Sequence, residues 1–307
     1  MNKRLKGTLQ LTLTSFIWGV AFVAQSVGMD YVGPWTFICA RYVLGGLVLI
    51  PVIYLISQLE YKQHIAAGKD DLPRTSLKDP QVRKNTLIGG LLCGVFLVSA
   101  SLFQQYGILE TSVGKAGFIT ALYIIIVPFL SIFLHKKIGL NEWISALIAV
   151  VGFYVMSIQG KPSINRGDVL LLICAFLYSM QILVIDHFVE KVNPVAMSCV
   201  QFFVSAIVGG IGMFILETPT WSSLIAAAGP ILYAGIMSSG VAYTLQIIGQ
   251  KNLEPTLASL LMSLESVFSA LAGFVILKQI LSTKEIIGCV LVFTGVILAQ
   301  LPKKESN

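Results

Sequence analysis

Residues 7–34 read GTLQLTLTSFIWGVAFVAQSVGMDYVGP, and residues 167–194 read GDVLLLICAFLYSMQILVIDHFVEKVNP. The two stretches match at a spacing of 160 residues, so that Gly7, Leu11, Phe16, Val32 and Pro34 recur as Gly167, Leu171, Phe176, Val192 and Pro194. Further along, FQQYG at Phe103–Gly107 recurs as LQIIG at Leu245–Gly249, now at a spacing of 142. The chain is therefore built from two related halves, each with five apolar segments.

The composition indicates an integral membrane protein. Hydrophobic residues make up 56% of the chain, charged residues only 12%, and the mean hydropathy is +0.83. A soluble domain carries about 25% charged residues. Because several windows of about 20 residues are nearly free of charge, they have the length and composition of membrane-spanning helices. The net charge of +6 comes from clusters between these windows, so it does not indicate nucleic-acid binding.

We predict an all-α membrane protein with ten transmembrane helices, arranged as two five-helix repeats over residues 1–160 and 161–307. The predicted helices are Leu5–Val27, Pro34–Ser57, Thr86–Leu109, Gly114–Leu134, Leu140–Ile158, Gly167–Phe188, Pro194–Leu216, Leu224–Gln250, Pro255–Leu277 and Thr283–Leu301. The two repeat spacings differ, which requires an insertion in the first half. The polar segment Gln58–Asn85 is expected to form this loop.

The distribution of positive charge predicts the orientation. With the N-terminus in the cytoplasm, 15 of the 21 Lys and Arg residues fall in cytoplasmic loops and tails, five fall outside, and Arg41 lies within a helix. This bias predicts that both termini lie in the cytoplasm. We also expect the protein to reside in the plasma membrane. Since each half has an odd number of helices, the second half must be inverted relative to the first. Inverted repeats of this kind are typical of secondary transporters, whose sites lie near mid-depth between the halves.

Four stretches in this order resemble one family: SFIWGVAF at residues 15–22, CARYVLGG at 39–46, TSVGKAGFITALYIIIVP at 111–128 and ASLLMSLESVF at 258–268. Together with the duplication, they resemble the EamA branch of the drug/metabolite transporter superfamily over nearly the whole chain. The resemblance implies a ten-helix carrier that exports amino acids or other small metabolites. Many members have Leu-Glu-Pro in the ninth helix, where this chain has Leu264-Glu265-Ser266, so a kink there is not implied.

Glu265 is the strongest candidate for a functional residue. It lies about ten residues into the ninth predicted helix, and an ionised carboxylate at that depth costs about 2.5–3.5 kcal/mol. It could carry a proton, which would allow proton coupling, or contact a substrate amine. A structural carboxyl that ties helices together is the alternative. Tyr123 aligns with Glu265 at the spacing of 142.

Arg41 has two interpretations. It lies about seven residues into the second predicted helix, roughly 10 Å below the outer end. Its guanidinium could reach the outer headgroups, or it could face a cavity and bind a substrate carboxylate.

Aromatic and amide side chains are the remaining candidates. Trp18 and Tyr178 are repeat-related and could form opposite walls of one pocket, although packing is the simpler role for buried aromatics. Gln104 and Gln246 are also repeat-related and, like Gln181 and Tyr243, could bind a polar solute or bridge helices. Pro128 could hinge the fourth helix.

The sequence thus predicts a carrier for a small polar or zwitterionic metabolite, in contact with membrane lipid and without a cofactor, a metal or nucleic acid as partner. The predicted cavity lies between the first, third, fourth, sixth, eighth and ninth helices. A membrane enzyme acting on lipids would need clustered acid, base or metal-binding residues, and a small-ion channel would need a ring of repeated polar groups. The ionisable residues within the predicted helices are single and dispersed.

Overall fold

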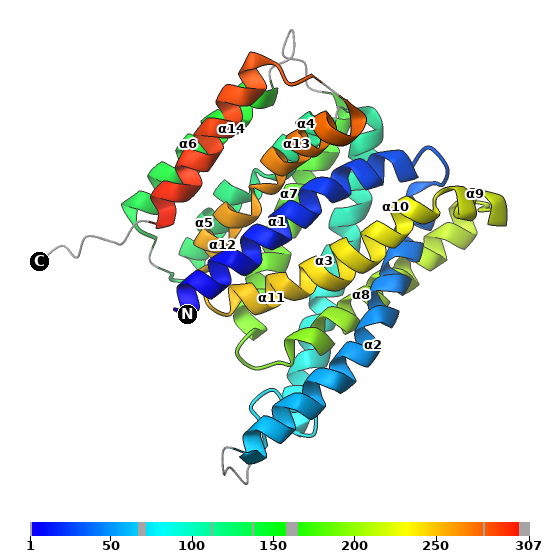
Figure 1. The fold of residues 1–307 in the computed structure, drawn as a ribbon, viewed down its shortest axis with the longest axis vertical. Coiled ribbons are helices and arrows are strands. Elements are labelled where there is room, and N and C mark those ends of the chain that lie inside the picture. The colour runs from blue at the N-terminus through cyan, green and yellow to red at the C-terminus, as the bar shows by residue number, and fades with distance from the viewer. Residues whose placement is uncertain are drawn as a thin grey trace, which may run out of the picture.

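The computed structural model describes residues 2–66, 72–111, 113–136, 138–157, 165–278 and 280–300, and every regular element in these ranges is a helix (Figure 1). Nine of the described helical segments are long and apolar enough to cross a membrane, and a shorter apolar helix covers Leu140–Val155. The predicted boundary between the repeats, at residues 160 and 161, lies outside the described residues.

The first half contains six helices: α1 Lys3–Gly28, α2 Pro34–Ala66, α3 Pro80–Glu110, α4 Val113–Thr120, α5 Tyr123–Phe133 and α6 Leu140–Ser157. The second half contains α7 Arg166–Phe188, α8 Pro194–Leu216, α9 Trp221–Ala226, α10 Ala228–Leu232, a π-helix η1 Tyr233–Tyr243, α11 Thr244–Gln250, α12 Pro255–Met262, α13 Glu265–Leu277 and α14 Thr283–Gln300. Several helices begin where the sequence offers a cap. Asp79 accepts hydrogen bonds from the backbone of α3, and Asn193 does so for α8, each directly before a proline.

The prediction that Gln58–Asn85 forms a loop is largely wrong, because both ends of this segment are helical. Helix α2 continues to Ala66, and α3 already begins at Pro80. Hydropathy marks where a helix leaves lipid rather than where it ends, and the polar residues after Ser57 include neither glycine nor proline before Gly68. Both helices therefore extend beyond their apolar segments.

The fourth and ninth predicted helices are each broken, and the two breaks are equivalent. Residues 121–122 separate α4 from α5, and residues 263–264, which lie 142 positions later, separate α12 from α13. Leu122 N donates to the carbonyl of Ile119 and, in the second half, Leu264 N donates to that of Leu261. These bonds span three residues rather than four, which tightens the turn and re-aims the helix that follows. The break in the ninth helix thus forms without the proline of the family motif. In the fourth helix it lies before Pro128, which is inside α5.

The eighth predicted helix is also irregular, whereas its repeat partner in the first half, the third predicted helix, is regular. Eleven residues of it, Tyr233–Tyr243, form the π-helix η1, whereas the equivalent residues 91–101 lie in the unbroken helix α3. Long π-helices are rare and often occur at functional sites. This difference changes the direction of the side chains that η1 presents to the interior.

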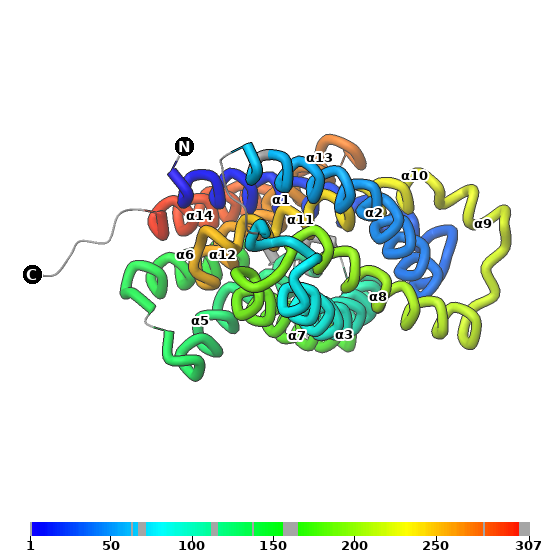
Figure 2. Tube along the Cα trace, turned by 90° about the horizontal axis from the view of Figure 1, so that it is seen from below, coloured from blue at the N-terminus to red at the C-terminus, as the bar shows by residue number. Residues whose placement is uncertain are grey.

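Helices far apart in sequence pack as neighbours. Helix α6 packs against α14, α2 against α8, α3 against α7 and α8, and α1 against α11 and α13. Figure 2 shows α1, α2 and α13 on one side of the molecule and α3, α7 and α8 on the other. The guanidinium of Arg4 donates to the carbonyls of Ala299 and Gln300, so the two ends of the described chain lie together.

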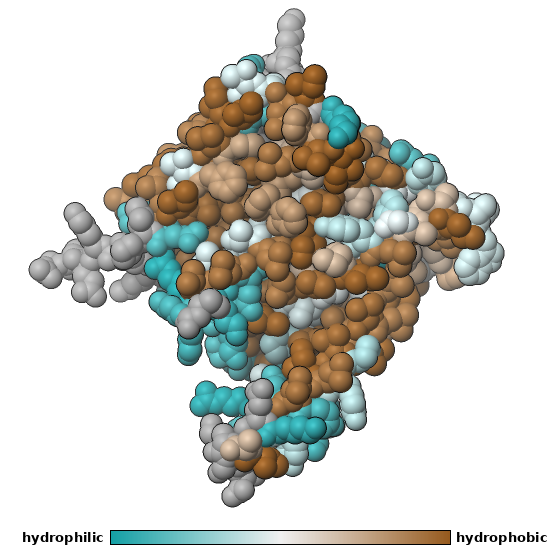
Figure 3. All heavy atoms as spheres, viewed as in Figure 1, coloured by the Kyte–Doolittle hydropathy of each residue, from teal (hydrophilic) through white to brown (hydrophobic). Residues whose placement is uncertain are grey.

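Hydrophobic side chains cover much of the face shown in Figure 3, and hydrophilic ones gather toward the N-terminal end of the bundle. Large apolar side chains such as Phe214 and Ile225 are more than two-thirds exposed. A soluble monomer rarely exposes apolar surface on this scale, whereas a lipid-facing surface requires it.

Candidate functional site

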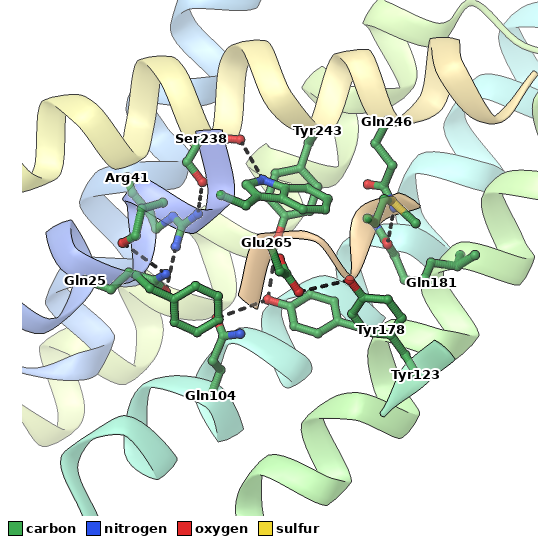
Figure 4. A pocket seen from close by; sticks show the side chains of 15 residues that line it. Gln25, Arg41, Gln104, Tyr123, Tyr178, Gln181, Ser238, Tyr243, Gln246 and Glu265 are labelled. Carbon is green, nitrogen blue, oxygen red and sulfur yellow. Dashed lines mark hydrogen bonds between the residues drawn. The ribbon is translucent and has the colours of Figure 1, made fainter. Parts of the chain in front are cut away.

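A narrow cavity of about 30 Å³ lies between the helices of the two halves (Figure 4). Its walls come from α1, α2, α3, α5, α7, η1, α11, α12 and α13. The lining residues are Trp18, Ala21, Phe22, Gln25, Arg41, Gln104, Tyr123, Tyr178, Gln181, Ile182, Ser238, Tyr243, Gln246, Met262 and Glu265. That volume holds roughly two water molecules.

The structure brings all nine sequence-predicted site residues to this one cavity. They are Trp18, Arg41, Gln104, Tyr123, Tyr178, Gln181, Tyr243, Gln246 and Glu265. The predicted six helices all contribute, and α2 adds Arg41. Whether these residues bind a substrate stays a prediction, but their convergence in space is a structural fact.

Arg41 points into the interior rather than toward the membrane surface, and only 3% of it is exposed. Its Nη1 donates to Gln25 Oε1 at 3.2 Å, its Nη2 to Ser238 Oγ at 3.0 Å and its Nε to Ser239 Oγ at 3.4 Å. All three partners are neutral. Because a guanidinium has five N–H donors, Arg41 keeps capacity to bind a further acceptor, and a carboxylate is the partner that its forked geometry fits best.

Glu265 is buried at the first residue of α13, directly after the break in the ninth helix. The hydroxyl of Tyr123 donates to Glu265 Oε1 at 3.0 Å. Tyr123 begins α5, directly after the equivalent break in the fourth helix. The two breaks therefore bring the first residues of two helices together at the cavity wall.

Tyr178 lies at the centre of a cluster of hydroxyl groups. Its hydroxyl donates to Gln104 Oε1 at 3.5 Å, accepts from the hydroxyl of Tyr243 at 3.4 Å and lies 3.4 Å from Ser101 Oγ. Ser101 in turn lies 2.6 Å from the hydroxyl of Tyr42. Such hydroxyls can each donate and accept, so the cluster can rearrange its bonds around a polar solute.

Trp18 lines the cavity beside Tyr243 and is held by the π-helix η1. Its indole Nε1 donates to the backbone carbonyl of Ser238 at 3.3 Å, and its ring lies 4.6 Å from that of Tyr243. Tyr243 thus contacts both Trp18 and Tyr178, and the role of these two aromatics as opposite walls of a binding pocket stays a prediction. Both Ser238 and Tyr243 belong to η1, so the π-helix supplies the contact.

Gln181 and Gln246 lie at the other end of the cavity from Arg41 in the view of Figure 4. Gln246 Nε2 donates to Gln181 Oε1 at 3.2 Å, and Gln181 Nε2 donates to Gln201 Oε1 at 3.3 Å. Glu265 lies between these amides and the cluster of Arg41 and Gln25 (Figure 4). The cavity therefore presents a cation, a carboxyl group and neutral amides along its length.

Sequence reasoning missed Gln25 and passed over Ser238. Gln25 lies seven residues after Trp18, so both fall on one face of α1, and a glutamine near the end of an apolar helix is a signal that could have found it. Ser238 was recognisable only as one of several polar residues in the eighth helix. Its role depends on the π-helix, which no sequence pattern indicated.

A polar cavity enclosed by helices of membrane-spanning length defines a class, the multi-pass membrane transporters. A model of the EamA-like transporter family matches residues 5–158 and again residues 165–301. The chain belongs to this family, which is part of the drug/metabolite transporter superfamily.

Similar proteins carry compatible names. The chain is 27% identical over 300 residues to an uncharacterized transporter of Archaeoglobus fulgidus, covering 97% of this chain and 87% of that one. It is 20% identical over 306 residues to the uncharacterized transporter YoaV of Bacillus subtilis, covering 97% of both. Protein PecM of Dickeya dadantii is 26% identical over 221 residues, with 70% and 72% covered. A solved crystal structure matches 96% of both chains with a TM-score of 0.73 at 19% identity, which shows a shared fold.

Proposed function

We propose that this protein is an alternating-access carrier that exports small polar or zwitterionic metabolites, such as amino acids, across the plasma membrane. The observation that carries the proposal is the presence of Arg41 and Glu265 on one buried cavity, with aromatic and amide walls between helices of both halves. Arg41 would bind the carboxylate of a zwitterion, and Glu265 would contact its amine or carry a proton. An arginine and a carboxyl group that line one cavity suit a solute with opposite charges at its two ends.

The packing of equivalent glycines supports the two inverted repeats on which the mechanism rests. A Cβ added to Gly7 would lie 3.0 Å from the carbonyl oxygen of Gly249, and a Cβ added to Gly167 would lie 3.0 Å from that of Gly107. Gly7 and Gly167 are repeat partners, as are Gly107 and Gly249. The contact between α1 and α11 is therefore repeated between α7 and α3, as a two-fold relation between the halves requires.

This relation also supports ten membrane crossings, with α6 as the fifth and α14 as the tenth. Helix α6 packs against α14, its partner in the repeat, and α2 packs against its partner α8. The cluster of positive charge on loops near the N-terminus favours a cytoplasmic position for both ends. The two halves would rock about the cavity and expose it to each side in turn.

The broken helices would add a local rearrangement to this rocking of the two halves. Tyr123 and Glu265 directly follow the breaks, so a change in the angle between α4 and α5, or between α12 and α13, would move them relative to the cavity. At each break only a single turn would have to rearrange, because the helices on either side of it are regular.

Counterflow in proteoliposomes tests the proposal. Vesicles loaded with one unlabelled metabolite and exposed outside to the same labelled metabolite should accumulate label transiently and with saturation. A panel of amino acids, amines and carboxylic acids identifies the substrate class, with and without a proton gradient. Saturable exchange for at least one zwitterion is expected. Flux without exchange would indicate a channel, and chemical conversion of an added lipid would indicate an enzyme.

A further inference from the structure

A second cavity lies at the end of the bundle that holds the N-terminus, and its wall meets that of the central cavity. Gln246 lines the central cavity, and Gln250, one turn further along α11, lines the second. Gln250 Nε2 donates to the backbone carbonyl of Ile182 at 3.2 Å, and Ile182 lines the central cavity. One hydrogen bond therefore joins the walls of the two cavities.

Four glutamines occupy this junction, and three of them have unpaired polar atoms. Gln181, Gln201, Gln246 and Gln250 are each at most 2% exposed. Gln201 Nε2, Gln246 Oε1 and Gln250 Oε1 have no hydrogen-bond partner among the described residues. Buried polar atoms nearly always have partners, so the unpaired atoms of Gln246 and Gln250, which line the two cavities, indicate a group or water that is bound there. The junction offers one donor and two acceptors.

The repeat relates this junction to Arg41. Gln201 lies 160 residues after Arg41, the spacing of the first repeat match, and Cys199 likewise follows Cys39. Arg41 on α2 binds Gln25 of α1, and Gln201 on α8 binds Gln181 of α7. Because α1 and α7 are equivalent, as are α2 and α8, the two hydrogen bonds join equivalent pairs of helices, although Gln25 corresponds to Ile185 and lies one turn away from the position of Gln181. The first half has a cation where the second half has a neutral amide.

We propose that Gln181, Gln201, Gln246 and Gln250 form a second solute site, the amide site, on the cytoplasmic side of the central cavity. It takes uncharged hydrogen-bonding groups, such as hydroxyls and amides, and holds the polar end of a solute that enters from the cytoplasm before Arg41 binds its carboxylate. The assignment rests on the proposed carrier function and orientation.

Cysteine labelling tests the amide site without knowledge of the substrate. Single cysteines replace Gln201, Gln246 and Gln250 in turn, and a charged, membrane-impermeant thiol reagent is added to inside-out vesicles. Ile247→Cys is the matched control, because Ile247 lies at the same depth on α11 but packs in an apolar cluster with Cys93, Ile185 and Met197. The unmodified protein, which has five cysteines of its own, gives the background. If the Gln201→Cys variant fails to insert into the membrane, Gln250→Cys is used instead, because it removes only the described hydrogen bond from Gln250 to the carbonyl of Ile182.

We expect the cysteines at 246 and 250 to react from the cytoplasmic face at least about tenfold faster than the cysteine at 247, because charged reagents need a hydrated path. Equal rates at 246, 247 and 250, or no reaction at 246 and 250, would overturn the amide site. Gln25→Cys, labelled from the outer face, separates this failure from that of the carrier. If Gln25→Cys reacts only from the cytoplasmic face, the proposed orientation fails as well. If Gln25→Cys reacts from the outer face while Gln246→Cys and Gln250→Cys stay unreactive, only the proposal of the amide site is contradicted.

Discussion

Tyr123 and Glu265 occupy the same position in the two halves, 142 residues apart, and they form a hydrogen bond with each other at 3.0 Å. Two equivalent residues touch only when they lie beside the axis that relates their repeats. This contact is what the proposed two-fold relation between the halves predicts, and one half supplies a hydroxyl where the other supplies a carboxyl. This asymmetry makes Glu265 the natural place to begin testing.

Replacement of Glu265 by Gln should impair transport without loss of expression. Glutamine preserves the shape of the side chain and can still accept a bond from Tyr123, but it cannot carry a negative charge or a transferable proton. We expect counterflow to fall at least about tenfold, the effect of losing a bond to a charged group. Tyr123→Phe removes only the hydroxyl and should have a smaller effect. Unaltered exchange in Glu265→Gln would remove this carboxyl from the mechanism.

Replacement of Arg41 by Lys should weaken the transport of solutes that carry a carboxylate. Lysine keeps the charge but loses the planar fork that can bind Gln25, Ser238 and a carboxylate together. The loss of one charge-assisted bond is worth about 1.5–3 kcal/mol, so the half-saturating concentration should rise roughly 10- to 100-fold. Exposed Arg166, replaced in the same way, serves as the control. An equal rise for substrates without a carboxylate would argue against the assigned contact.

Replacement of Gly19 by Ala should strongly destabilise the protein. A Cβ there would lie 2.8 Å from the backbone carbon of Phe268 and from the backbone nitrogen of Ser269, so α1 and α13 would have to separate. Overpacking of this kind costs about 1–3 kcal/mol. Gly229→Ala is the matched control, because a Cβ at Gly229 meets nothing within 4 Å. Thermal unfolding in detergent should separate the two variants, and equal melting temperatures would contradict the close crossing.

Replacement of Glu217 by Ala should loosen the join between α2 and α8. The Glu217 carboxylate, at the end of α8, accepts from Trp35 N at 3.0 Å and from Thr36 N at 2.8 Å, and so caps α2. Loss of such a cap costs about 0.5–2 kcal/mol. Glu254 precedes α12 without a side-chain bond to its backbone, so Glu254→Ala should change the melting temperature far less. A comparable shift in both variants would exclude a capping role.

Many of the cavity-lining residues could be predicted from the sequence, because repeat spacing and isolated polar residues are strong signals in membrane-spanning helices. Trp18, Gln104 and Gln246 stand out as polar or amphipathic groups inside apolar helices, and such groups turn toward protein rather than toward lipid. The repeat then indicated which helices should share a cavity. The same reasoning could not choose between the two directions open to Arg41, since the choice depends on whether Gln25 and Ser238 lie within reach.

The break in the ninth helix and the π-helix in the eighth could not be predicted from the sequence. The break after Met262 contains neither glycine nor proline, and the Ser263 hydroxyl donates to the backbone carbonyl of Leu260 at 2.8 Å within it. The π-helix around Ser238 likewise leaves no mark in the sequence of the eighth helix. Both irregularities aim side chains into the cavity, so the details of the site depend on tertiary contacts that no local pattern encodes.

The most direct test of the account is the accessibility of Ser238, which binds Arg41 and lines the central cavity. Ser238→Cys changes one atom, and the cysteine can be labelled with an impermeant thiol reagent in right-side-out and in inside-out vesicles. A carrier whose halves rock about this cavity predicts labelling from both faces, with substrate slowing the reaction on each. Labelling from one face alone, unaffected by any metabolite that the protein exchanges, would contradict it.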